Sequence, residues 1–167
     1  MGTSSSHSPA SLPFPLSVTV SEPGWAKVVG PSPQGFVARA LRPALPELEA
    51  VPGGELSVAL VSDAEIAELN SRFRGKSGPT NVLAFPAAPP FAAHMQGDVV
   101  VALQTVLREC HRQRKTAPAH ASHLLVHGFL HLQGFDHQTD PEREAMEALE
   151  RAALARLGID DPFVMPA

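Results

Sequence analysis

Three histidines in one short run are spaced as ligands of a single metal ion. His127 and His131 are four residues apart, so in a helix both imidazoles project from one face about one turn apart. Gly134 follows where such a helix should end, and a glycine there allows the chain to reverse and bring His137 back toward the pair. Three neutral imidazoles leave a fourth position open to water. This pattern is typical of a catalytic zinc site, since structural zinc sites are normally closed by four protein ligands.

Two further side chains accompany these histidines. His123 lies one turn before His127 on the same helix face, but a fourth ligand there would close the site. We interpret His123 as a residue that supports the ligands, lines a substrate groove or simply packs in the core. Asp136, which directly precedes His137, is expected either to orient a ligand imidazole or to accept hydrogen bonds from backbone amides in the turn.

The spacing overlaps the zinc-protease pattern H-E-x-x-H-x-x-G-x-x-H, in which the glutamate is the general base. Gly128 stands where that glutamate would be. The site would keep a metal that activates water and polarises an oxygen, but it lacks the carboxylate on which this type of peptide hydrolysis relies. A zinc metallopeptidase-like hydrolase is therefore an alternative function that the missing base disfavours.

Three stretches resemble a known family. The run His127-Gly-Phe-Leu-His-Leu-Gln-Gly-Phe-Asp-His137 resembles the H-G-x-L-H-L-x-G-Y-D-H signature of the YbeY-type endoribonucleases, the bacterial rRNA maturation factors, with Phe135 in place of the usual tyrosine. The stretch Leu69-Asn-Ser-Arg-Phe-Arg-Gly-Lys-Ser-Gly-Pro-Thr-Asn-Val-Leu-Ala-Phe-Pro86 is similar to the family's L-N-x-x-Y-R-x-x-D-x-P-T-N-V-L-S-F-P. Gly97-Asp-Val-Val-Val101 matches its G-D-I-x-I strand. The three stretches occur in the family's order, and the resemblance extends over residues 15–163.

This resemblance implies metal-dependent, single-strand-specific cleavage of RNA in rRNA processing, namely 16S rRNA 3′ end maturation, and in ribosome quality control. It implies one Zn²⁺ ion per chain at His127, His131 and His137, ribosomes or ribosomal proteins as partners, and a cytoplasmic location. No DNA and no membrane partner is expected. A non-catalytic ribosome-assembly factor that uses the metal only for stability is a second alternative.

Cleavage of a phosphodiester also needs a cation near the charge that develops at phosphorus. An arginine can supply two parallel hydrogen bonds there, which a lysine cannot reproduce. Arg74 is our candidate, although its position is equally that of a surface arginine at a helix C-terminus. The resemblance points to this same arginine as functional, which makes the expected catalytic set Arg74, His127, His131 and His137. The proton acceptor is left open between metal-bound hydroxide and a group acting on the RNA 2′-OH.

Composition limits the class of protein. The 167 residues fit one domain, and a single cysteine, Cys110, excludes an internal disulfide framework and suits a reducing cytosol. No apolar run approaches the roughly 18 residues that a membrane span requires.

The net charge of -4 argues mildly against a nucleic-acid partner, but the charges are unevenly distributed. Basic residues cluster at Arg72, Arg74 and Lys76 and at Arg108, Arg112, Arg114 and Lys115. Acidic residues concentrate at Glu142, Glu144, Glu147 and Glu150.

The pattern of apolar residues predicts an α+β fold, with a small mixed β-sheet packed with helices and a central buried helix that carries the histidines. Residues 1–14 are expected to be a disordered tail, and residues 15–167 a single endoribonuclease domain. Strands are predicted at 17–20, 55–61, 81–85 and 98–102. Helices are predicted at 36–50, shortened or kinked by two prolines, and at 62–74, 104–115, 118–133 and 141–157, the last capped by Asp140.

Overall fold

The elements of the chain follow the predicted order. The computed structural model describes residues 11–164. Its elements are β1 (Leu16–Val20), η2 (Pro23–Trp25), α1 (Ala26–Val29), α2 (Pro33–Leu41), η3 (Arg42–Glu47), β2 (Glu55–Val61), α3 (Asp63–Arg74), β3 (Val82–Pro86), η4 (Phe91–Ala93), β4 (Met95–Ala102), α4 (Leu103–Arg112), α5 (Ala117–Leu132) and α6 (Asp140–Arg156). Within this range no helix is both long and apolar enough to cross a lipid bilayer.

The sheet is small and mixed, as predicted. Its strand order is β1-β2-β4-β3, with β1, β2 and β4 parallel and β3 antiparallel to β4. The β3–β4 connection is short enough for an antiparallel pair, whereas each parallel pair is joined by a crossover that contains helices. The α+β class predicted from the sequence is therefore confirmed.

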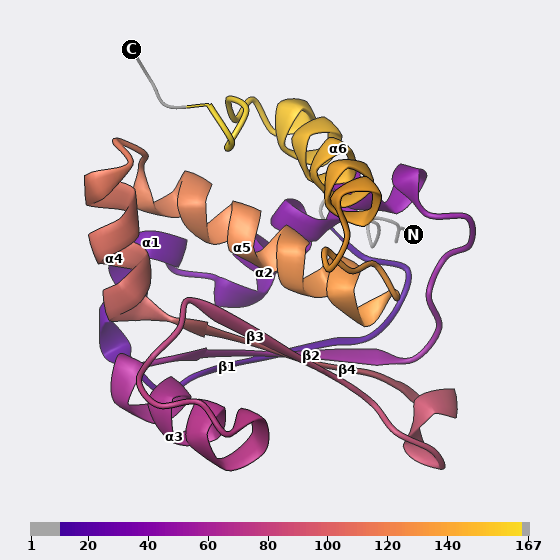
Figure 1. Cartoon of the computed structure of the whole chain (residues 1–167), viewed down its shortest axis with the longest axis horizontal. Coiled ribbons are helices and arrows are strands. Elements are labelled where there is room, and N and C mark those ends of the chain that lie inside the picture. Colours follow the sequence, from indigo (N-terminus) through magenta and orange to yellow (C-terminus); the bar gives the residue numbers. More distant parts are fainter. Residues whose placement is uncertain (1–10, 165–167) are drawn as a thin grey trace, which may run out of the picture.

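Each face of the sheet is covered by different helices. Successive side chains of a strand point to opposite faces, so β4 contributes Val99 and Val101 to one core and Val100 and Ala102 to the other. The larger core lies under α5, with α1, α2 and α6 on the same side, and α3 alone covers the opposite face (Figure 1).

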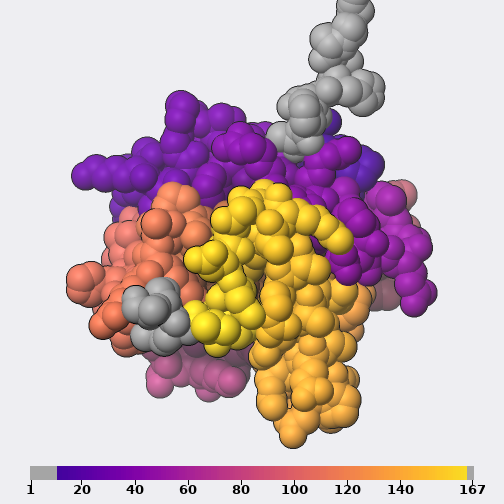
Figure 2. Space-filling view, turned by 90° about the horizontal axis from the view of Figure 1, so that it is seen from above, coloured from indigo at the N-terminus to yellow at the C-terminus, as the bar shows by residue number. Residues whose placement is uncertain are grey.

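Helix α5 is the central buried helix that the sequence predicts. Thr116 caps its first turn by accepting a hydrogen bond from the backbone amide of Ala119 at 3.3 Å, and Pro118 occupies the second helical position. Its side chains pack on the sheet, α2 and α6, and the most buried are Leu124, Leu125, Val126, Phe129 and Leu130. The space-filling view shows α6 and the segment after it, in orange to yellow, lying over this side of the molecule (Figure 2).

Two predicted boundaries differ in the structure. Most of the predicted tail, residues 1–10, lies outside the described residues, but Phe14 is in the core and its ring is 6.0 Å from that of Phe129. The tail prediction was therefore wrong for residues 11–14, because an isolated aromatic in a proline-rich stretch gives no periodic signal. The cap of α6 is Thr139 rather than Asp140, through a reciprocal pair of hydrogen bonds with Glu142.

Two prolines shorten the helix predicted at 36–50, as expected. Helix α2 ends at Leu41, and the chain continues through Glu47 as a 3-10 helix that contains Pro43 and Pro46. Proline cannot donate the backbone hydrogen bond that an α-helix would need at these positions.

Candidate metal centre

The structure brings the three histidines of the predicted site together. His127 and His131 project from one face of α5, Gly134 adopts a positive φ of 101°, and the reversed chain returns His137 to the pair. One ring nitrogen from each residue lies within 4.8 Å of the others. A side chain at Gly134 would meet no other atom, so the conformation of the turn, and not the available space, favours a glycine.

The spacing of these nitrogens fits a tetrahedral metal site. The Nε2 atoms of His127 and His131 are 3.2 Å apart. Two nitrogens bound to one tetrahedral zinc at the usual bond length would be separated by about 3.3 Å. His127 Nδ1 lies 2.5 Å from a carboxylate oxygen of Glu150, so this nitrogen carries the proton and the Nε2 lone pair faces the cluster.

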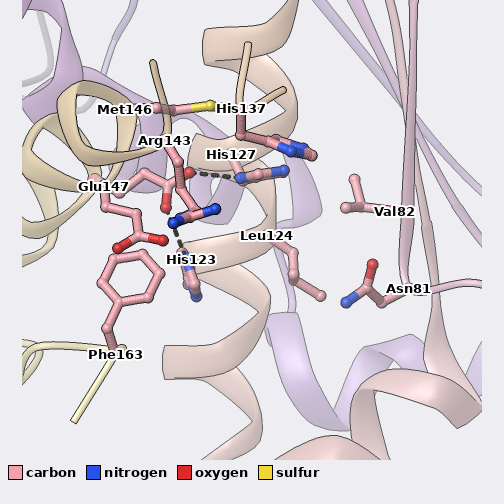
Figure 3. A pocket seen from close by; sticks show the side chains of 11 residues that line it. Asn81, Val82, His123, Leu124, His127, His137, Arg143, Met146, Glu147 and Phe163 are labelled. Carbon is pink, nitrogen blue, oxygen red and sulfur yellow. Dashed lines mark hydrogen bonds and ion pairs between the residues drawn. The ribbon is translucent and has the colours of Figure 1, made fainter. Parts of the chain in front are cut away.

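Glu150 is the residue of the site that the sequence analysis missed. It was grouped with the acidic residues of the C-terminal segment, but its side chain is only 1% exposed. Its two carboxylate oxygens bond His123 Nε2 at 3.1 Å and His127 Nδ1 at 2.5 Å. The two histidines are labelled in Figure 3, where dashed lines reach them. Glu150 lies four residues after the buried Met146, on the apolar stripe of α6. A glutamate on such a stripe is the sequence signal that would have identified it.

The surroundings of the cluster favour a charged carboxylate at Glu150 and a neutral His131. Burial would raise the pKa of Glu150, but the hydrogen bonds from His123 and His127 and the nearby imidazole charge outweigh it and lower the pKa to about 2. Burial lowers the pKa of His131, and the neighbouring His127 and His137 lower it further. A neutral His131 keeps the lone pair that a metal requires.

His123 and Asp136 stand beside the three histidines and not among the candidate ligands. Burial lowers the pKa of His123, against the opposing effect of its bond with Glu150, and its ring centre is 6.4 Å from that of His127. Asp136 accepts a hydrogen bond from the backbone amide of His137 at 2.7 Å. Of the two roles expected for Asp136, the structure therefore contains the bond to a backbone amide in the turn.

A polar cavity of about 460 Å³ opens on the histidines, and Arg74 lines it. Arg74 is the last residue of α3, and Gly75 in the left-handed conformation directs the chain away from the helix there. The Arg74 guanidinium forms no ion pair with any of the described residues, whereas the neighbouring Arg72 pairs with Glu68. Of the two basic clusters in the sequence, only the first lines this cavity, through Arg74 and Lys76.

Gly128 has a packing role that explains the missing glutamate. A Cβ atom at this position would lie 2.7 Å from Val99 Cγ1 and 3.3 Å from Val82 Cγ2, both on the sheet. The glycine thus allows α5 to pack closely on β3 and β4. A glutamate here would be forced into the sheet, so the general base of the zinc-protease pattern has no place in this fold.

Comparison with known proteins decides the family. The family model described as Endoribonuclease YbeY matches residues 28–158. This chain belongs to the YbeY family. Endoribonuclease YbeY of Rhodopseudomonas palustris strain CGA009 is 51% identical over 138 residues, which are 79% of this chain and 73% of that protein. Endoribonuclease YbeY of Azorhizobium caulinodans is 47% identical over 157 residues, which are 91% of this chain and 98% of that protein.

A solved structure shares the fold of this chain. The solution structure of TM1509 from Thermotoga maritima aligns with a TM-score of 0.56 at 24% identity, over 86% of this chain and 91% of that one. The curated YbeY relatives carry an endoribonuclease name, and the sheet excludes a glutamate at position 128. Neither the peptidase-like nor the non-catalytic alternative is therefore favoured.

Proposed function

We propose that this YbeY-family protein is a metal-dependent endoribonuclease that cleaves single-stranded RNA in rRNA processing, including 16S rRNA 3′ end maturation, and in ribosome quality control. The observation that carries this proposal is the convergence of His127, His131 and His137 at the edge of a cavity lined by an unpaired arginine. We assign the activity to one domain, residues 15–167 of the prediction, extended to include the core residue Phe14.

We propose one Zn²⁺ ion per chain as the cofactor. Three imidazoles, with no fourth ligand among residues 11–164, are the donor set of catalytic zinc, and the spacing of their nitrogens fits this metal. When bound, the ion supplies a Lewis acid for a phosphate oxygen and lowers the pKa of a water molecule. Glu150 keeps His127 in the tautomer whose Nε2 is free to bind, and Asp136 holds the turn that presents His137.

In this proposal Arg74 and Lys76 bind the RNA backbone. Both cations line the cavity that opens on the histidines, and Asp136 is the acidic residue among its lining side chains. The planar Arg74 guanidinium can hold two phosphate oxygens at once and stabilise the charge that develops on them. Lys76 adds a second positive charge for the strand that leads away from the cleaved bond.

The partners and location follow from this function. We propose single-stranded rRNA as the substrate, ribosomes or ribosomal proteins as the partners, and the cytoplasm as the location. We expect no DNA substrate and no membrane partner.

The experiment that tests the proposed function combines elemental analysis with a nuclease assay. The purified protein should contain about one zinc per chain and should cleave a labelled single-stranded RNA, while a duplex of the same sequence is spared. A chelator should abolish the cleavage, and added Zn²⁺ should restore it. Metal-loaded protein that leaves single-stranded RNA intact would contradict the proposal.

Arg74→Ala tests the role of the arginine, with Arg72→Ala as the matched control. Losing one donor to a developing oxyanion typically lowers kcat roughly 10²- to 10³-fold, so we expect a loss of that size with full zinc content. Arg72, two residues earlier on α3 and paired with Glu68, should be dispensable. Cleavage that is unchanged in Arg74→Ala would remove this arginine from the site.

A further inference from the structure

A second cavity meets the first at the histidines. It has a volume of about 290 Å³ and shares Asn81, Val82, His127 and His137 with the polar cavity. Figure 3 shows its walls: His123, Glu147 and Phe163 lie on one side, Asn81 and Val82 lie across from them, and His127 and His137 close one end. A group bound at the histidines would therefore border both cavities.

The two cavities differ in chemistry. The second cavity has an apolar lining contributed by four separate parts of the chain, namely Val82 of β3, Leu124 of α5, Met146 of α6 and Phe163 after α6. Its charged lining residues are Arg143, Glu147 and Glu150. Arg143 already pairs with Asp140 at 2.7 Å, and the buried carboxylate of Glu150 is hydrogen-bonded to two histidines. The two glutamates of the second cavity would repel a phosphate, whereas Arg74 and Lys76 of the polar cavity would attract one.

We propose that this second cavity, the base pocket, receives one unpaired nucleobase adjacent to the cleaved phosphate. This inference rests on the proposed function and adds a substrate contact to it. A nucleobase is flat, neutral and largely apolar on its faces, which suits walls of valine, leucine, methionine and phenylalanine. The half-buried Glu147 at the pocket provides an acceptor for a base amino group.

The pocket also gives a physical reason for single-strand specificity. A base can enter it only after leaving the stack of its neighbours, and unstacking is least costly where the base is unpaired. The phosphate on the Arg74 side and the base on the Phe163 side would together fix the position of the bond between them. A paired base, held in its duplex, could not occupy the pocket.

Single abasic substitutions in the RNA test the base pocket directly. A series of single-stranded RNAs with a known cut site would each lack one base near it, and kcat/KM would be measured with the zinc-loaded protein. Removing the base that enters the pocket should lower kcat/KM by about tenfold, the effect of losing one stacked base. Removing a base several nucleotides away should have little effect.

Phe163→Ala links that effect to the pocket. Phe163 is 40% exposed, lies after the last helix and contacts His123 with ring centres 5.3 Å apart, so its removal should spare the fold. The variant should cut intact RNA several-fold less well, yet cut the sensitive abasic RNA about as well as the wild type does. The cleavage of intact RNA by Phe163→Leu should be intermediate between that of the wild type and that of Phe163→Ala. Phe91→Ala is the matched control, because Phe91 is 63% exposed and lines neither cavity.

A readout independent of cleavage completes the test. Binding of intact and abasic RNA to the chelated protein, measured by fluorescence anisotropy, should show the same base-dependent difference in the wild type and lose it in Phe163→Ala. Equal losses on intact and abasic RNA, or no position where a missing base matters, would overturn the base pocket and leave the proposed function intact. A zinc-loaded wild type that cuts no RNA at all would overturn both.

Discussion

Two carboxylates pair with histidines of α5, but only one of them pairs with a histidine of the candidate metal centre. Glu109 of α4 bonds His120 Nε2 at 2.8 Å and accepts from Asn81 at 3.0 Å. Glu150 of α6 bonds both His123 and His127. Hydrogen bonds lower the pKa of each carboxyl group against the opposing effect of burial.

The difference lies in what the paired histidine faces. His120 is 4% exposed, and its Nδ1 has no hydrogen-bond partner among the described residues. His127 instead presents its Nε2 to His131 at the edge of an open cavity. The same carboxylate–imidazole pair is thus part of the core in one place and orients a candidate ligand in the other, and solvent access decides which.

The largest contrast is expected between a variant that removes a histidine of the metal centre and one that removes the buried His120. His131→Ala should lose zinc and RNA cleavage altogether while keeping its fold, because the side chain is half-buried at the cavity edge. His120→Ala should keep zinc but lose roughly 1–3 kcal/mol of stability, since it leaves Glu109 without its partner in the interior. Zinc content, cleavage and urea unfolding measure the two effects.

His94→Ala is the control for both variants, because His94 is exposed and its bond to Glu55 uses its backbone carbonyl. If His131→Ala and the chelated wild type both unfolded, the metal would be structural. Zinc loss in His120→Ala would instead show that the two clusters are coupled.

Exchanging the carboxylates for amides should give a smaller contrast. Glu150→Gln keeps the shape of the side chain but weakens the bond that fixes His127, and such changes typically cost 10- to 100-fold in metal affinity. Glu109→Gln should leave the affinity unchanged, because its partner His120 is not among the candidate ligands. Competition with a chromophoric chelator measures both zinc affinities. Equal losses of affinity in Glu150→Gln and Glu109→Gln would contradict a special role of Glu150 in orienting a ligand.

The pairing of Glu150 also predicts how stability without metal depends on pH. The pKa of Glu150 is about 2 in the folded chain, below the 4.5 of an unperturbed glutamate, so its ionised form stabilises the fold above pH 4.5. This contribution, on the order of 3 kcal/mol, is lost as the pH falls from 4.5 toward 2. The stability difference between wild type and Glu150→Gln should therefore shrink over that window in urea unfolding. A difference that stays constant from pH 6 to pH 3 would argue against an ionised Glu150.

Much of the site was predictable because its parts are close in the sequence. The four-residue spacing of His127 and His131 fixes their relation in any helix, and Gly134 permits the reversal that returns His137. The helix predicted at 62–74 likewise matches α3, which follows a capping box of Ser62 and Glu65 and ends at Arg74. Glu150 escaped because an acidic residue among other acidic residues of a helix is usually solvated.

The α+β class, the helix that carries the histidines and the order of the three ligand candidates could be predicted from the amino-acid sequence, because hydrophobic period and backbone geometry act over a few residues. The packing of the folded chain was needed to show that Glu150 of α6 faces His123 and His127, that Arg74 of α3 lines the cavity at the histidines, and that Phe163 lines a second cavity. These contacts join elements far apart in the chain. Their positions depend on how α3, α5 and α6 pack around the sheet, and no local spacing encodes that arrangement.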